Sequence, residues 1–118
     1  MNQFSRSKLQ PPDYIKDGNE AFLAGRFNLA AQAFAKAHRN DPRNPVPLFN
    51  LASAKERTGD IAEAAANLTR ALRLRPGWSE PAQRLALLLA RYVLPSPGEL
   101  NPHGLLAAFA FDNIDQQP

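Results

Sequence analysis

PVPLFNLASAKERTGDIAEAAANLTRALRLRP, residues 45–76, contains two amphipathic helical patterns with a Gly-Asp turn between them, and it ends at a proline. The same arrangement occurs 34 residues earlier in the chain. The matching positions are the turn glycine, the packing positions of the second helix and the final proline: Gly59 and Gly25, Ile61 and Phe27, Ala64 and Ala30, Leu68 and Phe34, Ala71 and Ala37, Pro76 and Pro42. This internal repeat predicts stacked helical hairpins.

Composition supports a single globular domain. The chain has 118 residues, of which 44% are hydrophobic and 21% charged, and it has no cysteine, so a disulfide framework and thiolate metal sites are excluded. A formal charge of +3 does not indicate nucleic acid as a partner. The polar N-terminal residues show no secretory signal, and the apolar runs 85–90 and 105–111 are too short to span a bilayer. We therefore expect a cytoplasmic protein with no membrane partner.

The first repeat is preceded by a flexible lead-in, residues 1–12, which ends in a Pro-Pro pair that stops any helix before it. Asp13 is expected either to cap or to lie in the first turn of a helix that runs to about Gly25, where glycine supplies the left-handed conformation of a helix end. A second helix is expected over about residues 28–39, and Asp41-Pro42 ends it.

The second repeat carries clearer signals at its helix ends. Asn44 is expected to be the N-cap of its first helix, with Pro45 at the first helical position. Asp60 and Glu63 have the spacing of a capping box for its second helix. The first helix is expected to pack through a stripe made of Leu48, Leu51, Ala52 and Lys55.

A third repeat begins on schedule and then departs from the pattern. Ser79 precedes a helix in which Ala82, Leu85 and Ala86 repeat the packing positions of the second unit, but Val93 stands where the turn glycine is due. We expect a Pro-rich loop at 95–101 and a short helix from Asn101-Pro102 to about Asp112. Residues 114–118 are either a tail or the start of a truncated helix.

Residues 13–93 resemble the tetratricopeptide repeat (TPR) family. The chain has the family's small and leucine residues in the first helix, its turn glycine, the aromatic or aliphatic residue after it, and then its alanine, phenylalanine or leucine, alanine and proline. It departs from the family pattern at Asp17, Ala21 and Lys55. The resemblance implies an all-α, right-handed α-solenoid of antiparallel helix pairs with about six helices over residues 13–113. Two full repeats, about 11–44 and 45–78, precede an irregular one at 79–112.

The resemblance also implies a concave surface formed by the first helix of each pair, and hence a groove for a peptide. The residues of these helices that lie off the packing stripe are expected to line it: Lys16, Asn19, Phe49, Asn50, Ser53, Arg57, Gln83, Arg84, Leu87 and Arg91. Amides and guanidinium groups donate hydrogen bonds, so this set suits a peptide that carries a carboxylate.

Chaperone-binding members of the family hold a C-terminal carboxylate with two asparagines, two lysines and an arginine. Asn19, Asn50 and Arg84 fall on three of those positions, whereas Ile15 and Glu80 stand where the two lysines belong. The sequence therefore favours a peptide specificity that differs from that of the chaperone clamp.

Three interpretations of function follow. The first is a non-catalytic protein–protein interaction module, a scaffold or adaptor, with no cofactor and no metal site. The second is an N-terminal adaptor or oligomerisation segment of a larger enzyme whose catalytic domain lies beyond Pro118. The third is self-association or domain docking through the apolar C-terminal end, which contains Leu105, Leu106, Phe109 and Phe111.

Overall fold

The computed structural model describes residues 11–93, and all of their regular secondary structure is helical. The elements are α2 (Tyr14–Leu23), α3 (Phe27–Asn40), α4 (Val46–Arg57), α5 (Ile61–Leu74), α6 (Ser79–Leu88) and the π-helical turn η1 (Leu89–Val93). The predicted all-α class is confirmed.

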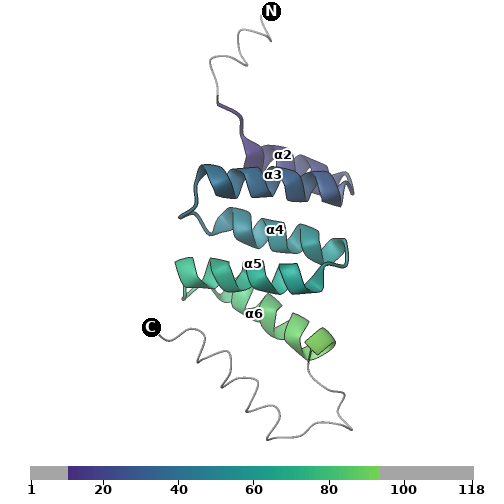
Figure 1. Ribbon diagram of the computed structural model, residues 1–118, viewed down its shortest axis with the longest axis vertical. Helices are drawn as coiled ribbons and strands as arrows, with labels where there is room; N and C mark the ends of the chain where they lie inside the picture. The colour runs from purple at the N-terminus through teal and green to yellow at the C-terminus, as the bar shows by residue number, and fades with distance from the viewer. Residues whose placement is uncertain (1–10, 94–118) are drawn as a thin grey trace, which may run out of the picture.

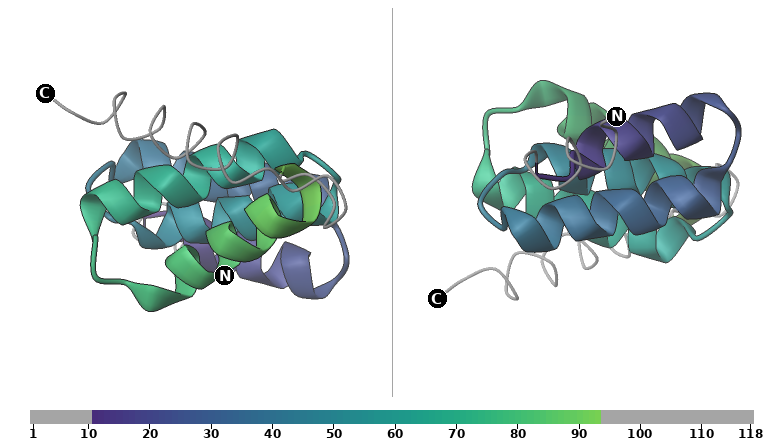
Figure 2. Two further views of the ribbon diagram at one scale, coloured as in Figure 1. Left: turned by 90° about the horizontal axis from the view of Figure 1, so that it is seen from below. Right: turned by 90° about the horizontal axis from the view of Figure 1, so that it is seen from above.

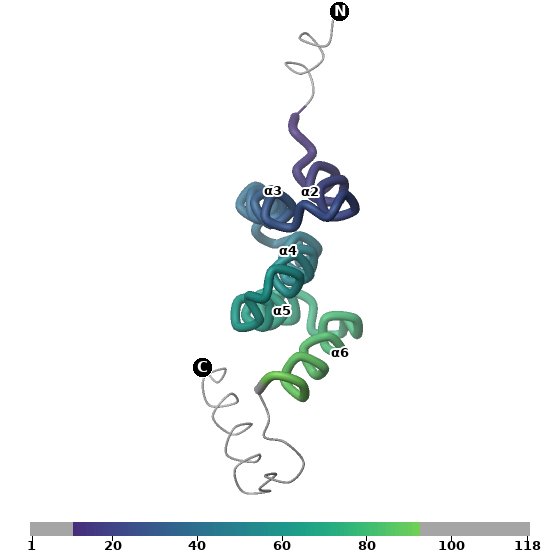
Figure 3. Tube along the Cα trace, turned by 90° about the vertical axis from the view of Figure 1, so that its right-hand side faces the viewer, coloured from purple at the N-terminus to yellow at the C-terminus, as the bar shows by residue number. Residues whose placement is uncertain are grey.

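The helices form an open stack of antiparallel pairs. Each helix packs mainly on its neighbours in sequence, so that α2 packs on α3, α3 on α4, α4 on α5 and α5 on α6 (Figure 1). Viewed from the side, α2, α4 and α6 form one layer and α3 and α5 form the other (Figure 3). End-on views show the successive pairs lying over one another (Figure 2). Contacts between sequence neighbours are the packing mode of an α-solenoid, in which each unit covers the apolar face of the next.

The two turns inside the hairpins depend on glycine. Gly25 and Gly59 have φ angles of +78° and +88°, in the left-handed region that favours glycine. In the first turn the N–H of Arg26 donates to the carbonyl of Ala21 at 2.8 Å, and in the second the N–H of Asp60 donates to the carbonyl of Lys55 at 2.8 Å. These bonds satisfy the free carbonyls at the end of α2 and of α4, as the sequence predicts.

The apolar core is divided between two clusters, and α4 contributes to both. Leu51 and Ala54 pack with α3 in a cluster that also contains Ala30, Ala31 and Phe34. Ala52 packs on the other side, in a cluster with Ala64, Leu68 and Leu88. Helix α4 therefore packs against α3 through one cluster and against α5 and α6 through the other. These two sets of contacts hold α4 in its place in the layer of α2, α4 and α6.

The helix ends agree with the sequence only in part. Asp13 accepts a hydrogen bond from the backbone N–H of Lys16 at 3.0 Å, as an N-cap does. Asn44 accepts one from the backbone N–H of Val46 at 3.0 Å, so it supplies the expected acceptor although α4 begins one residue later than predicted. The predicted capping box at Asp60 and Glu63 is wrong. Asp60 makes no side-chain cap bond, because Thr58 and the Lys55 ammonium group face its carboxylate instead.

The third repeat differs from its expected burial. Pro81 and Leu88 are the buried residues of α6, whereas Ala82 and Ala86, expected to pack, are exposed. In the second repeat Ala52, the equivalent of Ala86, packs with Ala64 and Leu68 of α5, and no described helix follows α6 to cover Ala86 in the same way. The backbone continues from α6 directly into η1, which ends at Val93, the position where the turn glycine was expected.

Several expectations fall outside the described residues. They are the lead-in before Pro11, the loop at 95–101, the short helix of residues 101–112 with its Leu105, Leu106, Phe109 and Phe111, and residues 114–118. Within residues 11–93, none of the helices has both the length and the apolar character needed to cross a membrane.

Candidate functional site

The ten residues expected to line a groove all lie in one layer of the structure. Two are on α2, four on α4, three on α6 and one on η1. We call this surface the α2–α4–α6 face (Figure 3). Seven of the ten are exposed, and Phe49, Asn50 and Ser53 are half-buried. None of the ten is fully buried.

One hollow on this face lies at its α6 end. It has a volume of about 360 Å³, and Arg84, Leu87 and Arg91 line it together with Leu88, Ala90 and Glu56. Leu87 is 63% exposed there. The structure thus brings three of the predicted residues together around one depression, two of them cationic and one apolar.

Glu56 is a member of this hollow that the sequence analysis missed. Its Oε2 lies 3.6 Å from Nη1 of Arg84, so the two side chains form an ion pair between α4 and α6. Glu56 is three residues after Ser53, a spacing that places both on the same side of a helix. That spacing was available in the sequence, but only the packing of α6 beside α4 shows that Arg84 is its partner.

Phe49, one of the predicted groove residues, forms an aromatic pair with Trp78. The ring of Phe49 is 5.1 Å from the ring of Trp78, and the Arg75 guanidinium group lies 5.0 Å from the centre of the Trp78 ring. Trp78 is the only tryptophan in the chain. Because the indole packs against a predicted groove residue, its fluorescence can report on binding at this face.

Arg57 has a structural contact that the sequence did not predict. Its guanidinium group lies 5.5 Å from the centre of the Phe22 ring and 5.1 Å from that of Phe27, and the two rings pack edge to face. Cation–π contacts of this kind are worth about 0.5–1 kcal/mol at exposed sites. Arg57 therefore helps to join the second repeat to the turn of the first, and its substitution would test packing as well as ligand binding.

The residues that match the chaperone clamp are spread along the face. Asn19 is exposed on α2, Asn50 is half-buried on α4, and Arg84 is exposed on α6. Ile15 and Glu80, the departures from the clamp, are on α2 and α6. Lys16 lies next to Ile15 and is exposed, and Gln83 lies next to Arg84. The Ser53 hydroxyl donates to the carbonyl of Phe49 at 3.2 Å, within its own helix.

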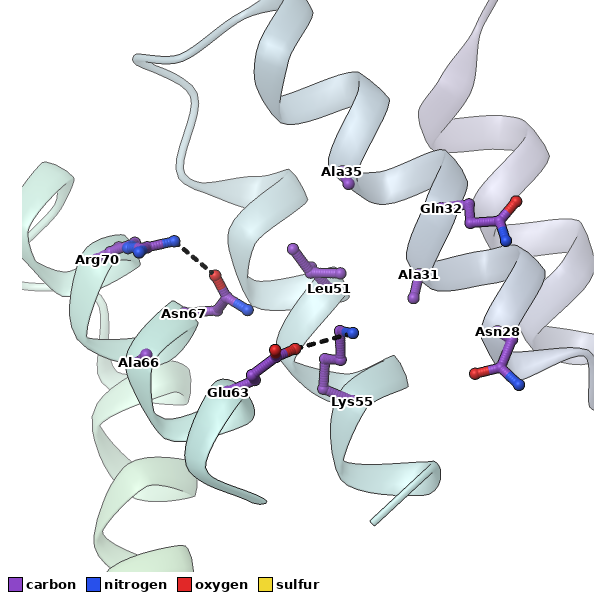
Figure 4. Close-up of a pocket in the computed structure, with 10 residues that line it drawn as sticks. All are labelled: Asn28, Ala31, Gln32, Ala35, Leu51, Lys55, Glu63, Ala66, Asn67 and Arg70. Atoms are coloured by element: carbon purple, nitrogen blue, oxygen red, sulfur yellow. Dashed lines mark hydrogen bonds and ion pairs between the residues drawn. The ribbon is translucent and has the colours of Figure 1, made fainter. Parts of the chain in front are cut away.

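A larger hollow, missed by the sequence analysis, lies on the opposite side of the stack. It occupies about 500 Å³ between α3 and α5, with α4 behind it (Figure 4). We call it the α3–α5 groove. It is lined by Asn28, Ala31, Gln32, Ala35, Leu51, Lys55, Glu63, Ala66, Asn67 and Arg70. The groove is open because alanines, which have short side chains, line both of its walls. The repeat pattern alone does not show this groove, because it depends on the distance between α3 and α5.

The Lys55 ammonium group forms an ion pair inside this groove. Its Nζ lies 2.8 Å from Oε2 of Glu63 and 3.8 Å from Oδ2 of Asp60, and the Lys55 side chain is 27% exposed. The hydrogen bond to the Glu63 carboxylate raises the pKa of Lys55 above its ordinary value of 10.5, although partial burial opposes the shift.

This pKa shift predicts a loss of stability at alkaline pH. A raised lysine pKa stabilises the folded state fully below the unfolded pKa, near 10.4, and the contribution disappears as pH rises through the higher folded pKa. The wild-type protein should therefore be more stable than Lys55→Met at neutral pH, with a free energy of unfolding that is higher by less than about 1 kcal/mol. This difference between the two proteins should become smaller above about pH 10.5. Urea unfolding at both pH values measures it. When Glu63 is replaced by Gln, the stability difference between the proteins with and without Lys55 should depend less on pH. A difference that stays constant up to high pH would contradict the ion pair between Lys55 and Glu63.

Comparison with known protein families agrees with this architecture. Residues 21–92 match a family model described as tetratricopeptide repeat. The match begins in the second half of α2 and extends into η1, so it includes both turn glycines and most of the α2–α4–α6 face.

Proposed function

Because the chain belongs to the tetratricopeptide repeat family, whose repeats mediate protein–protein interactions, we propose that it is a non-catalytic module that binds a partner peptide on the α2–α4–α6 face. The observation that carries the proposal is the gathering of Arg84, Leu87 and Arg91 around one hollow on that face. A groove that offers two guanidinium groups and an apolar side chain suits a peptide that ends in a carboxylate next to an apolar residue.

The charges of the hollow favour this ligand. Among the described residues Arg91 has no ion-pair partner, while Arg84 is held by Glu56 at 3.6 Å. A carboxylate can bind Arg91 directly and can also compete with Glu56 for Arg84. Guanidinium–carboxylate hydrogen bonds are roughly twice as strong as neutral ones. The amides of Asn19, Asn50 and Gln83 supply further donors along the face.

Removal of both guanidinium groups should weaken peptide binding. Two libraries of random-sequence peptides serve as probes, one with a free C-terminal carboxylate and one with a C-terminal amide. Wild type should bind the carboxylate library more tightly, and Arg84→Gln with Arg91→Gln should reduce that binding about tenfold or more. Isothermal titration calorimetry provides the measurement, and circular dichroism checks that helicity is retained.

The matched control removes the same charge from the other layer. Arg39 and Arg73 are exposed on α3 and α5, so Arg39→Gln with Arg73→Gln should leave binding close to that of wild type. Equal losses in both double variants would indicate a general charge effect and would contradict the proposed face. Equal binding of the two libraries would contradict the carboxylate specificity.

A further inference from the structure

The α3–α5 groove has the features of a binding site in its own right. Its volume of about 500 Å³ lies within the range of about 300–1,000 Å³ that is usual for ligand sites. Leu51 and Ala31 at its base are 9% and 7% exposed. Ala35 and Ala66 occupy the walls, where a longer side chain would fill the space. The groove therefore combines an apolar base with polar groups from both α3 and α5.

Asn67 is the polar group that the groove buries most deeply, with only 5% of its surface exposed. Its Oδ1 accepts a hydrogen bond from Arg70 Nη1 at 3.4 Å. A guanidinium group only donates, so this contact fixes the amide with Oδ1 toward Arg70 and Nδ2 toward the groove (Figure 4). No described residue accepts a hydrogen bond from Nδ2, and this nitrogen is not sealed from solvent. A buried side chain thus presents an unused donor to the groove.

The remaining polar groups complete the recognition chemistry. Gln32 and Asn28 bring neutral amides from α3, on the wall opposite Asn67 (Figure 4). Lys55 and Glu63 neutralise each other across the groove. The net charge of the lining side chains is then that of Arg70 alone, which is exposed. Such a surface suits a ligand that is neutral along most of its length, presents hydrogen-bond acceptors and carries one acidic group.

We propose that the α3–α5 groove is a second peptide-binding site, on the side of the stack opposite the α2–α4–α6 face, and that it takes an extended segment with an acidic side chain. Asn67 Nδ2 donates to a main-chain carbonyl of the segment, and Arg70 binds its carboxylate. An extended main chain supplies carbonyl acceptors on both sides, which matches amide donors on two walls. The apolar base at Leu51 and Ala31 covers the side chains that point inward.

The test uses a short threonine peptide with one central glutamate, capped at both ends so that no terminal carboxylate is present. Titration into the ¹⁵N-labelled chain should shift the side-chain amide signals of Asn67 and Gln32. The same capped peptide with lysine in place of the glutamate should bind more weakly, since it places a cation beside Arg70. No shift of these signals at millimolar peptide would overturn the proposal.

Two variants locate the site. Ala66 is an exposed residue of the groove wall, so Ala66→Trp should fill the groove without disturbing the core and should weaken binding about tenfold or more. Ala62→Trp introduces the same side chain on the same helix, at an exposed residue that does not line the groove, and should bind like wild type. Equal affinity of the two variants would place the peptide elsewhere.

Asn67→Asp tests the donor itself. The substitution keeps an oxygen for Arg70 and replaces Nδ2 with a second acceptor, so it should weaken binding about tenfold. Arg84→Gln with Arg91→Gln should leave binding of the capped peptide unchanged. If that double variant abolishes the binding instead, the capped peptide occupies the α2–α4–α6 face and the second site is wrong. The two proposals can therefore fail independently.

Discussion

Leu68→Asp is expected to abolish cooperative folding of the helical stack. Leu68 is completely buried, in a cluster with Ala52, Ala64 and Leu88 that joins α4, α5 and α6. No cation lies in that cluster, so the carboxylate would be buried without a partner, at a cost of about 3–5 kcal/mol. Domains of this size have only about 5–15 kcal/mol of stability in total. Thermal unfolding followed by far-UV circular dichroism should show a large loss of helix and of cooperativity.

Leu74→Asp provides the matched control. Leu74 is the last residue of α5 and is 42% exposed, so the same change in charge on the same helix leaves the carboxylate in contact with water. Its effect should be about 1 kcal/mol, since the only charge penalty is that of an anion at the C-terminal end of a helix. If Leu68→Asp unfolds no more readily than Leu74→Asp, the second cluster does not hold the repeats together as described.

Gly18→Ala is expected to destabilise the first repeat by about 1–3 kcal/mol, even though alanine is the better helix former by about 1 kcal/mol. Gly18 is buried within α2, and a Cβ atom there would lie 2.4 Å from Cε1 and 2.6 Å from Cδ1 of Phe34. The Phe34 ring is itself 1% exposed, so moving it aside would disturb the residues that bury it. Urea unfolding of both proteins measures the difference.

The second repeat provides the means to rescue this variant. There the equivalent pair is Ala52 and Leu68, which share one buried cluster. The larger residue on the first helix thus accompanies the smaller one on the second. Phe34→Leu should therefore relieve the overlap, and the Gly18→Ala, Phe34→Leu double variant should be more stable than the sum of the two single changes predicts, by about 1 kcal/mol or more. Strictly additive effects would contradict the direct contact.

A glycine outside the core controls for glycine replacement in general. A Cβ atom at Gly77 would meet nothing within 4 Å, and its φ is not in the left-handed region. Gly77→Ala should therefore be neutral or slightly stabilising, because it only reduces the freedom of the unfolded chain. Destabilisation equal to that of Gly18→Ala would remove the steric explanation.

The sequence by itself determined the repeat, the helices and the turns between them. Gly25 and Gly59 could be identified because the left-handed turn of a helical hairpin is a local requirement that glycine meets best. Ala30, Phe34, Ala64 and Leu68 could be identified as core because burial on one face of a helix follows the helical period. These features depend on spacing along the chain, and the same spacing occurs twice in the sequence, 34 residues apart.

Only the tertiary structure decided which side chains meet across helices. Lys55 forms an ion pair with Glu63, and the expected capping box is absent. Arg84 forms an ion pair with Glu56. The Arg57 guanidinium group lies over the rings of Phe22 and Phe27. The α3–α5 groove arises in the same way, from the distance between two helices that are separated by a third. A long polar side chain can reach several partners, and which one it contacts depends on how the helices are placed in space. The spacing of residues along the chain does not determine that placement.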